Sequence, residues 1–284
     1  MAQSVVVTGA NSGIGLATAV ELARAGYDVI GTVRTEDKAE RMRAAAAEKG
    51  QTVRSVLLDV ADERSTEQGF AEIDALTGGG PWAVVNNAGF AQAGAVEDVT
   101  PEQARYQLEV NLVAPARIAR LVLPGMRARG DGRIVNVSSI AGRVSTPLMG
   151  WYAASKHGIE ALSDALRIEV APFGVKVVLV EPGGFGTGIW DAGTESFPDV
   201  PGSAYAAAYE RGKAMTQRGH VLPDPVWVGR AIRLALATPV PLPRYLVGVD
   251  AVGMAIGDRL APTAVSDYVK GVGAGLRKVL PFRR

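Results

Sequence analysis

The sequence predicts an α/β fold in which a doubly wound parallel sheet lies between two layers of helices, a three-layer α/β/α arrangement. Short β-branched runs such as Ser4–Thr8 and Val175–Val180 are typical of strands that are buried on both faces in a parallel sheet. Helical segments separate these runs along the chain, which is the order found in β-α-β units. A glycine-rich turn, Gly9–Gly15, joins the first strand to the first helix.

The composition favours a single domain covering residues 1–284. The chain has 284 residues, of which 48% are hydrophobic, and no Pro/Ser-rich linker, charge block or repeat divides it. The net charge of +1 gives no electrostatic reason to expect nucleic acid as a partner. The absence of cysteine excludes disulfides and thiolate chemistry, and it fits a reducing compartment.

The sequence does not predict export or membrane insertion. The first residues lack a basic leader followed by an apolar core, so we expect no secretory signal. No apolar run reaches the roughly 20 residues that a bilayer-spanning helix needs. We therefore expect a soluble, cytoplasmic protein.

Local signals set the boundaries of the elements. Gly26 ends the first helix, and Thr100 with Pro101 begins a long one. The expected strands are Ser4–Thr8, Asp28–Val33, Val53–Leu58, Trp82–Val85, Arg133–Val137, Val175–Val180 and Tyr245–Val249. The expected helices run from the glycine turn to Ala25, over Glu36–Lys49, from about Glu63, from Thr100, over Trp151–Ala171 and over Asp224–Ala237.

The turn after the first strand has the composition of a phosphate site. It reads Gly9-Ala10-Asn11-Ser12-Gly13-Ile14-Gly15. Glycines allow the backbone to approach a pyrophosphate, which the positive end of the following helix attracts. A tight turn without a ligand is the alternative, but the order strand, glycine turn, helix favours a dinucleotide site.

The end of the second strand distinguishes the two nicotinamide dinucleotides. In this type of fold an acidic residue there binds the ribose of NAD, whereas an arginine accommodates the 2′-phosphate of NADP. The chain has Val33 at the acidic position and Arg34 directly after it. A guanidinium matches a phosphate with two hydrogen bonds, so NADP(H) is favoured over NAD(H). The alternative is that Arg34 is a solvated arginine at the end of the strand. The glycine loop also has Ser12 and no basic residue that could contact the phosphate.

The segment Trp151–Ala161 puts Tyr152 and Lys156 four residues apart on one helix face. Such a pair alone is common on helix surfaces, but Ser139 precedes Tyr152 by thirteen residues at the end of a strand-like run. Together with the turn T-G-A-N-S-G-I-G, these residues resemble the short-chain dehydrogenase/reductase family, in its classical type, over roughly residues 4 to 250.

The resemblance implies a Rossmann fold with Ser139, Tyr152, Lys156 and Asn111 as catalytic residues. Tyr152 would be the acid/base, its pKa lowered from about 10 by the lysine ammonium and the cationic nicotinamide. Ser139 would orient the substrate oxygen, and Lys156 would also hold the nicotinamide ribose. Asn111 would bend its helix and hold a proton-relaying water, or it could simply satisfy a backbone carbonyl. Ser138 is then structural.

The same resemblance implies the cofactor contacts. Asp59 matches a residue at the adenine amino group, although it could instead cap the helix from about Glu63. The run Asn86–Gly89 resembles the family's N-N-A-G signature, with asparagines that brace backbone, and Pro182–Thr187 resembles its P-G-x-x-x-T. The implied cofactor-binding residues are Gly9, Asn11, Ser12, Gly13, Ile14, Gly15, Arg34, Asp59, Val60, Asn87, Ala88, Gly89, Tyr152, Lys156, Pro182, Gly183, Phe185 and Thr187. No metal site is expected.

Beyond Gly188 the resemblance thins. Residues 188–222 lack strong periodicity, so we expect an irregular substrate loop or lid. Its large side chains, with Phe185 before it, favour a pocket for a bulky, uncharged, lipophilic ligand, or else they pack the loop against the domain. They are Trp190, Phe197, Tyr205, Tyr209 and Met215. The run Pro243–Gly248 loosely resembles the tail of family members that act on retinol-like and steroid-like alcohols.

Residues 250–284 form the predicted C-terminal helical tail. Apolar residues recur on one face, and three glycines weaken the helix. Docking on the parent domain or a second subunit is favoured over contact of nearby basic residues with an anionic membrane surface. The apolar face consists of Val265, Tyr268, Val269, Val272, Leu276, Val279 and Leu280, and the basic residues are Lys270, Arg277, Lys278, Arg283 and Arg284.

These observations predict an NADP(H)-dependent oxidoreductase that interconverts a secondary alcohol and a ketone. A non-catalytic NADP(H)-binding redox sensor, or an epimerase or dehydratase on the same scaffold, is the alternative. A hydrolase is not expected, because the chain lacks G-x-S-x-G and cysteine and has only His157 and His220 as imidazoles. The resemblance also implies a homodimer or homotetramer, paired through the helix from Thr100 and the helix of Tyr152.

Overall fold

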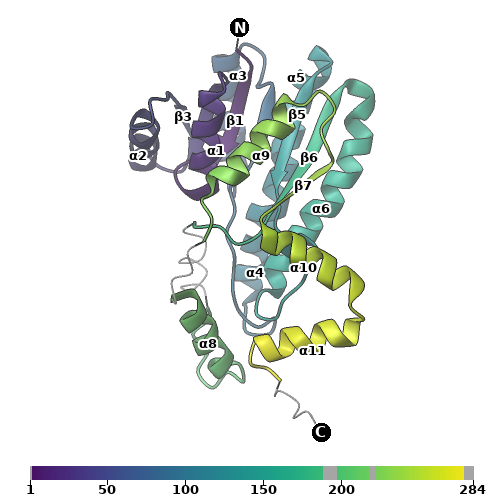
Figure 1. Ribbon diagram of the computed structural model, residues 1–284. Helices are drawn as coiled ribbons and strands as arrows, with labels where there is room; N and C mark the ends of the chain where they lie inside the picture. Colours follow the sequence, from purple (N-terminus) through teal and green to yellow (C-terminus); the bar gives the residue numbers. More distant parts are fainter. Residues whose placement is uncertain (1, 188–196, 218–221, 278–284) are drawn as a thin grey trace.

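Seven parallel strands form one sheet in the computed structural model, which describes residues 2–187, 197–217 and 222–277 (Figure 1). The strand order is β3-β2-β1-β4-β5-β6-β7, so the chain winds outward in both directions from β1 and β4. The carboxyl ends of these two strands are where such a sheet binds ligands. The strands are β1 (Ser4–Thr8), β2 (Asp28–Val33), β3 (Arg54–Leu57), β4 (Ala83–Asn86), β5 (Gly132–Val137), β6 (Val175–Pro182) and β7 (Arg244–Val247).

Helices cover both faces of the sheet, which confirms the predicted α/β/α layers. The α-helices are α1 (Gly13–Arg24), α2 (Glu36–Ala47), α3 (Glu63–Thr77), α4 (Pro101–Leu108), α5 (Ala114–Arg129), α6 (Gly150–Val170), α8 (Ala206–Gln217), α9 (Val226–Ala237), α10 (Val249–Leu260) and α11 (Thr263–Gly273). The short helices are η1 (Glu109–Val113), η2 (Ile140–Gly142) and η3 (Ala171–Phe173). None of the helices among the described residues has the length and apolar character needed to cross a membrane.

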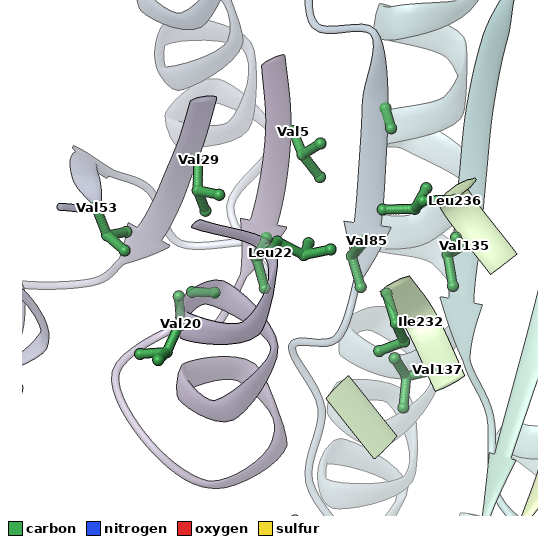
Figure 2. Packing of buried hydrophobic residues seen from close by; sticks show 14 of the residues in the cluster. Val5, Val20, Leu22, Val29, Val53, Val85, Val135, Val137, Ile232 and Leu236 are labelled. Atoms are coloured by element: carbon green, nitrogen blue, oxygen red, sulfur yellow. The ribbon is translucent and has the colours of Figure 1, made fainter. Parts of the chain in front are cut away.

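The core consists of two apolar clusters, one on each side of the sheet. Strand residues alternate between them, so Val5 and Val7 of β1 enter the first cluster and Val6 enters the second. Figure 2 shows the first cluster, in which Leu22 of α1 and Ile232 of α9 pack over the strand valines. α3 and α5 supply helical residues of the second cluster. Because both faces are covered, most strand residues are apolar, as the sequence predicted.

The long helix expected from Thr100 is interrupted in its middle. Its start is confirmed, because Thr100 and Gln103 form a reciprocal capping box. α4 then passes into the π-helix η1 before α5 continues to Arg129. Such π turns are frequent at functional sites. Asn111 lies inside this one.

The C-terminal region differs from its prediction in three places. Residues 188–222 are not wholly irregular, because they contain α8. The last strand ends at Val247 rather than Val249, and Val249 opens α10 instead. The tail consists of two helices separated at Ala261 and Pro262. In Figure 1, α8, α10 and α11 lie beyond the carboxyl ends of the strands.

The predicted apolar face of the tail is only partly covered. Val265 and Val269 are exposed, whereas Tyr268 and Val272 are half-buried. Some residues named in the sequence analysis lie outside the described residues, and these are Gly188, Trp190, His220, Lys278, Val279, Leu280, Arg283 and Arg284. The side chain of Met215 is not described either.

Candidate active site

The glycine turn between β1 and α1 leaves room for a ligand close to the backbone. A side chain at Gly15 could not fit, since a Cβ atom there would lie 2.2 Å from the carbonyl oxygen of Gly9. Gly9 and Gly13 have positive φ angles of 65° and 52°, which favour glycine. Ser12 begins α1 without a side-chain capping bond, and the first turn of the helix has no acidic residue. The helix amides therefore suit a pyrophosphate.

Other predicted residues of this turn divide between solvent and core. Ile14 packs against the first core cluster, whereas Ser12 is exposed and Asn11 is half-buried. Asn87 braces the turn as predicted, because its side-chain amide donates hydrogen bonds to the carbonyl oxygens of Thr8, at 2.9 Å, and Gly9, at 3.3 Å.

Thr8 holds the same junction from the strand side, a role that the sequence analysis missed. Its hydroxyl oxygen accepts hydrogen bonds from the backbone amides of Asn87 and Ala88, each at 3.0 Å. A polar residue that ends an otherwise apolar strand was the available signal. Ala88 itself packs against the second core cluster, and a Cβ atom on Gly89 would lie 3.1 Å from Asn111 Oδ1.

Arg34 lies directly after β2, at the place where the sequence predicts contact with the 2′-phosphate. Its side chain is exposed, and it forms no ion pair with any described residue. The guanidinium is therefore accessible at the carboxyl edge of the sheet.

Asp59 does not cap α3, so that alternative is wrong. The cap is Asp62, whose carboxylate accepts a hydrogen bond from the Ser65 amide at 2.7 Å. The Asp59 carboxylate instead accepts a hydrogen bond from the amide of Ala61 at 3.0 Å, which shapes the turn that contains buried Val60.

The segment Pro182–Thr187 lies beside the glycine turn. Pro182 ends β6, and a Cβ atom on Gly13 would lie 3.2 Å from the side chain of Thr187. Phe185 is buried and belongs to the first core cluster, so its side chain is not available to line a pocket. Only its backbone can make the predicted cofactor contact.

Ser139, Tyr152 and Lys156 are brought together at the end of β5 and the start of α6. Ser139 begins η2, Tyr152 lies in the first turn of α6, and its phenol hydrogen-bonds Ser139. Lys156 Nζ lies 5.8 Å from the centre of the Tyr152 ring and donates to the Val137 carbonyl at 2.9 Å. Tyr152 is 9% exposed and Lys156 is 6% exposed.

Burial sets the ionisation of both groups. It raises the pKa of Tyr152, and the hydrogen bond with Ser139 acts in the opposite direction. Burial also lowers the pKa of Lys156 to about 8, against the opposing charge of Glu160. We expected Lys156 to lower the pKa of Tyr152. Among the effects of the protein's own groups, burial of the phenol is the largest, and the pKa of Tyr152 is raised instead. The part assigned to the cationic nicotinamide stays a prediction.

Asn111 connects α6 to the loop after β4. Its side-chain amide donates to the Phe90 carbonyl at 3.0 Å and to Ser155 Oγ at 3.1 Å, and its Oδ1 accepts a hydrogen bond from the Phe90 amide at 3.2 Å. Ser155 Oγ in turn donates to the Tyr152 carbonyl at 2.7 Å. Asn111 thus satisfies a backbone carbonyl, and its relay role stays a prediction. Ser155 was missed, because a serine inside a helix carries no motif of its own.

A buried ionic cluster, also missed, joins Arg143 and α6 to the end of β6. Glu181 is fully buried and accepts two hydrogen bonds from Arg143, at 2.5 and 2.9 Å. Arg244 of β7 lies 3.3 Å from Glu181 and donates to Glu160 at 3.0 Å. Glu160 stands one helical turn after Lys156. A glutamate near the end of an apolar strand was the sequence signal for this cluster.

A cavity of about 330 Å³ lies where the loop after β4 meets the segment before α6. Its lining is mostly apolar and consists of Ala95, Val96, Glu97, Pro147, Leu148, Tyr205 and Leu276. Leu148 has a φ angle of 65°, a strained conformation that no other described non-glycine residue shares. Strain of this kind gathers at functional sites.

The predicted aromatic residues of the substrate loop have different positions. Tyr205 lines the cavity, as the pocket interpretation requires. Tyr209 is buried instead; its hydroxyl donates to Asp98 at 2.5 Å and accepts a hydrogen bond from the Ala95 amide at 2.9 Å. The Phe197 ring packs on Tyr209, with ring centres 5.2 Å apart. For these two residues the packing alternative is correct.

Comparison with known proteins identifies the family of this chain. The family model described as short chain dehydrogenase matches residues 3–196. The chain belongs to the short-chain dehydrogenase/reductase family. It is 39% identical to an uncharacterized oxidoreductase of Bacillus subtilis, over 86% of this chain and 88% of the relative. It is 34% identical to retinol dehydrogenase 7 of Rattus norvegicus, over 93% of this chain and 86% of the relative.

Two solved structures extend the similarity to the fold. A short-chain dehydrogenase from Streptomyces avermitilis superposes on this family member with a TM-score of 0.79 and 35% identity, covering 98% of this chain and 100% of the other. A metagenomic short-chain oxidoreductase in complex with NADP has a TM-score of 0.68 and 26% identity, covering 86% and 96%. The scaffold is that of a short-chain oxidoreductase, and the metagenomic neighbour binds NADP on it.

Proposed function

We propose that this protein is an NADP(H)-dependent oxidoreductase that interconverts a secondary alcohol and a ketone. The observation that carries the proposal is the position of Tyr152, a buried phenol that hydrogen-bonds Ser139 and has the Lys156 ammonium 5.8 Å from its ring. An acid next to a second hydroxyl group suits a substrate oxygen that changes between carbonyl and alcohol.

The division of labour follows from these contacts. The bound cofactor supplies the hydride chemistry. Tyr152 donates a proton to the carbonyl oxygen in reduction and takes one from the alcohol in oxidation. Ser139 orients the same oxygen, and its hydrogen bond with Tyr152 opposes the rise in the phenol pKa that burial causes. Lys156 holds the nicotinamide ribose. Asn111, through Ser155, fixes the backbone at Tyr152 and relays protons by a water.

The preference for NADP(H) rests on Arg34. Its guanidinium is exposed at the end of β2 and forms no ion pair with the described part of the chain, so it is available for a 2′-phosphate. The similarity to a metagenomic oxidoreductase in complex with NADP supports the same cofactor.

A bulky, uncharged, lipophilic substrate suits the cavity before α6. Five of its lining residues are apolar, namely Ala95, Val96, Pro147, Leu148 and Leu276. The relative named retinol dehydrogenase points to the same class of alcohol. Tyr209 and Phe185 are buried and do not line this cavity, and Trp190 lies outside the described residues.

A panel assay tests the function. Steroid-like, retinoid-like and aryl ketones are compared with acyl-thioesters and sugars while the absorbance of NADPH or NADH is followed. We expect turnover of an apolar ketone with NADPH. Binding of NADPH without turnover of any compound would favour a redox sensor, and preference for a charged substrate would contradict the apolar pocket.

We also propose that the protein forms a homodimer or homotetramer. Exposed apolar side chains along α4, η1 and α6 support this; they include Tyr106, Val113 and Ile168, of which Ile168 is 71% exposed. Light scattering at micromolar concentration tests it, and a monomer mass would contradict it.

A further inference from the structure

The C-terminal tail is hydrogen-bonded directly to the loop that follows β6. Asp250 lies in the first turn of α10, and its Oδ2 accepts a hydrogen bond from the backbone amide of Gly184 at 2.6 Å. The preceding amide, that of Gly183, donates to the Val247 carbonyl of β7 at 2.9 Å. Two consecutive amides of this loop are therefore held by residues from the last part of the chain.

The contact depends on glycine on both sides of the carboxylate. A Cβ atom on Gly183 would lie 2.3 Å from both carboxylate oxygens of Asp250, and one on Gly248 would lie 2.5 Å from Oδ1. Such distances are far inside van der Waals contact, so a side chain at either glycine would push the carboxylate away from Gly184. The carboxylate thus lies against backbone that follows β6 and β7, although Asp250 as a whole is exposed.

The same tail also reaches the cavity before α6. Leu276, which follows α11, lines the 330 Å³ cavity and also a second one of about 430 Å³, to which Lys270 of α11 contributes. The tail therefore contacts the loop after β6 at its beginning and the walls of the cavities at its end. A hydrogen bond from Lys270 to Asp258, at 2.6 Å, joins α11 to α10.

We propose that Asp250 is a positioning residue that makes the C-terminal tail part of the cofactor site. Its carboxylate fixes the Gly183–Gly184 backbone in the geometry that presents Pro182–Thr187 to the cofactor, a role for that loop which rests on the proposed function. Because coupling between two sites is reciprocal, binding of the cofactor also stabilises the docked position of α10.

The test compares three variants of the full-length protein. Asp250→Ala removes the acceptor, Asp250→Asn keeps an oxygen acceptor without the charge, and Asp258→Ala breaks a tail contact that does not touch the loop. NADPH affinity is measured by fluorescence titration, and amide exchange is followed by NMR on protein labelled with ¹⁵N-glycine.

We expect Asp250→Ala to weaken NADPH binding about fivefold, the loss of one hydrogen bond to a charged group that is accessible to water. Its Gly184 amide should exchange faster, whereas the Gly183 amide, bound to Val247, should not change. Asp250→Asn should recover most of the affinity, and Asp258→Ala should bind NADPH as the parent does. In the parent, NADPH should slow the exchange of glycines in α10, and Asp250→Ala should lose that effect.

The possible failures are distinguishable. A parent protein that binds neither NADPH nor NADH would contradict the proposed function itself. A parent that binds NADPH, with Asp250→Ala equal to it in affinity, would overturn only the role of Asp250. If Asp250→Asn were as weak as Asp250→Ala, the charge at the start of α10 would be responsible, and the role of the bond to Gly184 would be overturned.

Discussion

The sheet with its covering helices and the cap beyond it, formed by α8, α10 and α11, are held in place in different ways. α5 buries seven of its residues, whereas α10 buries only Ala251 and α11 only Gly271. The cap is held instead by polar bonds, such as those from Tyr209 to Asp98 and from the Gly184 amide to Asp250. Few buried apolar contacts mean low local stability. The proposed catalytic residues thus lie on the region with the buried core, and the cavity walls come partly from the cap.

Removal of one tyrosine hydroxyl from each region should give the largest difference in kcat. Tyr152→Phe removes the proposed acid/base, so kcat should fall by orders of magnitude while NADPH affinity stays nearly intact. Steady-state kinetics and fluorescence titration measure the two quantities. Near-normal turnover would contradict the mechanism.

The matched change in the cap is Tyr209→Phe, which removes the hydroxyl that bonds Asp98 and the Ala95 amide. We expect it to keep most of kcat and to raise the KM for substrate, because Ala95 lines the cavity. If Tyr209→Phe lowered kcat as strongly as Tyr152→Phe, the division between the two regions would fail.

Carboxylates in the two regions should differ in their effect on stability. Glu181→Ala removes the fully buried partner of Arg143 and Arg244, which should cost roughly 3 kcal/mol of unfolding free energy. Asp258→Ala, at a partly exposed ion pair of the cap, should cost no more than about 1 kcal/mol. Chemical denaturation measures both. Equal losses would show that the cap is as tightly integrated as the sheet.

Cofactor selection should depend on a single exposed side chain of the sheet region. Arg34→Ala removes a two-pronged charge-assisted contact worth roughly 1.5–3 kcal/mol, so NADPH binding should weaken about tenfold or more. Binding of NADH should not change. Arg41→Ala, at an exposed arginine of α2 that pairs with Asp37, is the control and should affect neither cofactor. An equal loss for NADPH and NADH would show that Arg34 does not contact the phosphate.

The smallest expected effect is a shift in pH dependence. The pKa of Lys156 is about 8 because burial lowers it, and the charge of Glu160 opposes that change. Ketone reduction that needs the ammonium should therefore decline as pH rises through about 8. Glu160→Gln removes the opposing charge and lowers the pKa of Lys156 further, so the decline should begin at lower pH.

The control for this shift is Glu169→Gln, an exposed site on the same helix, which should leave the pH profile of kcat/KM unchanged. A profile that stayed in place in Glu160→Gln would show that the ionisation of Lys156 does not limit the reaction.

The proximity of Ser139, Tyr152 and Lys156 could be predicted because a short-range pattern specifies it. Ser139 follows β5, and Tyr152 and Lys156 lie near the start of α6. The fold brings these two segments together, so residues that are close in the sequence are also close in space. Strands were predicted for a similar reason: both of their faces are buried, and the sequence records this as apolar runs. Only the strand ends moved by one or two residues, as for β7.

Residues that act through distant partners could not be predicted. Thr8, Glu181 and Asp250 bond to partners that lie 80, 38 and 66 positions away, and no local pattern marks such pairs. The rise in the pKa of Tyr152 was not predicted for a related reason. It depends on burial of the phenol by the whole domain rather than on the nearby lysine. α8 was missed because its only large apolar residues are Tyr209 and Met215, which are too few to set a helical period, and because its anchoring bond to Asp98 is polar.

The position of β7 in the sheet has a consequence for synthesis of the protein. Within the described part of the chain, β7 pairs only with β6, from Leu179 opposite Arg244 to Pro182 opposite Val247. Until residue 247 has left the ribosome, a nascent chain therefore presents one side of the mostly apolar strand Val175–Pro182 as an open edge. Unpaired edges of this kind invite strand addition from other chains. A premature stop before β7 should consequently yield an aggregating product rather than a shorter enzyme.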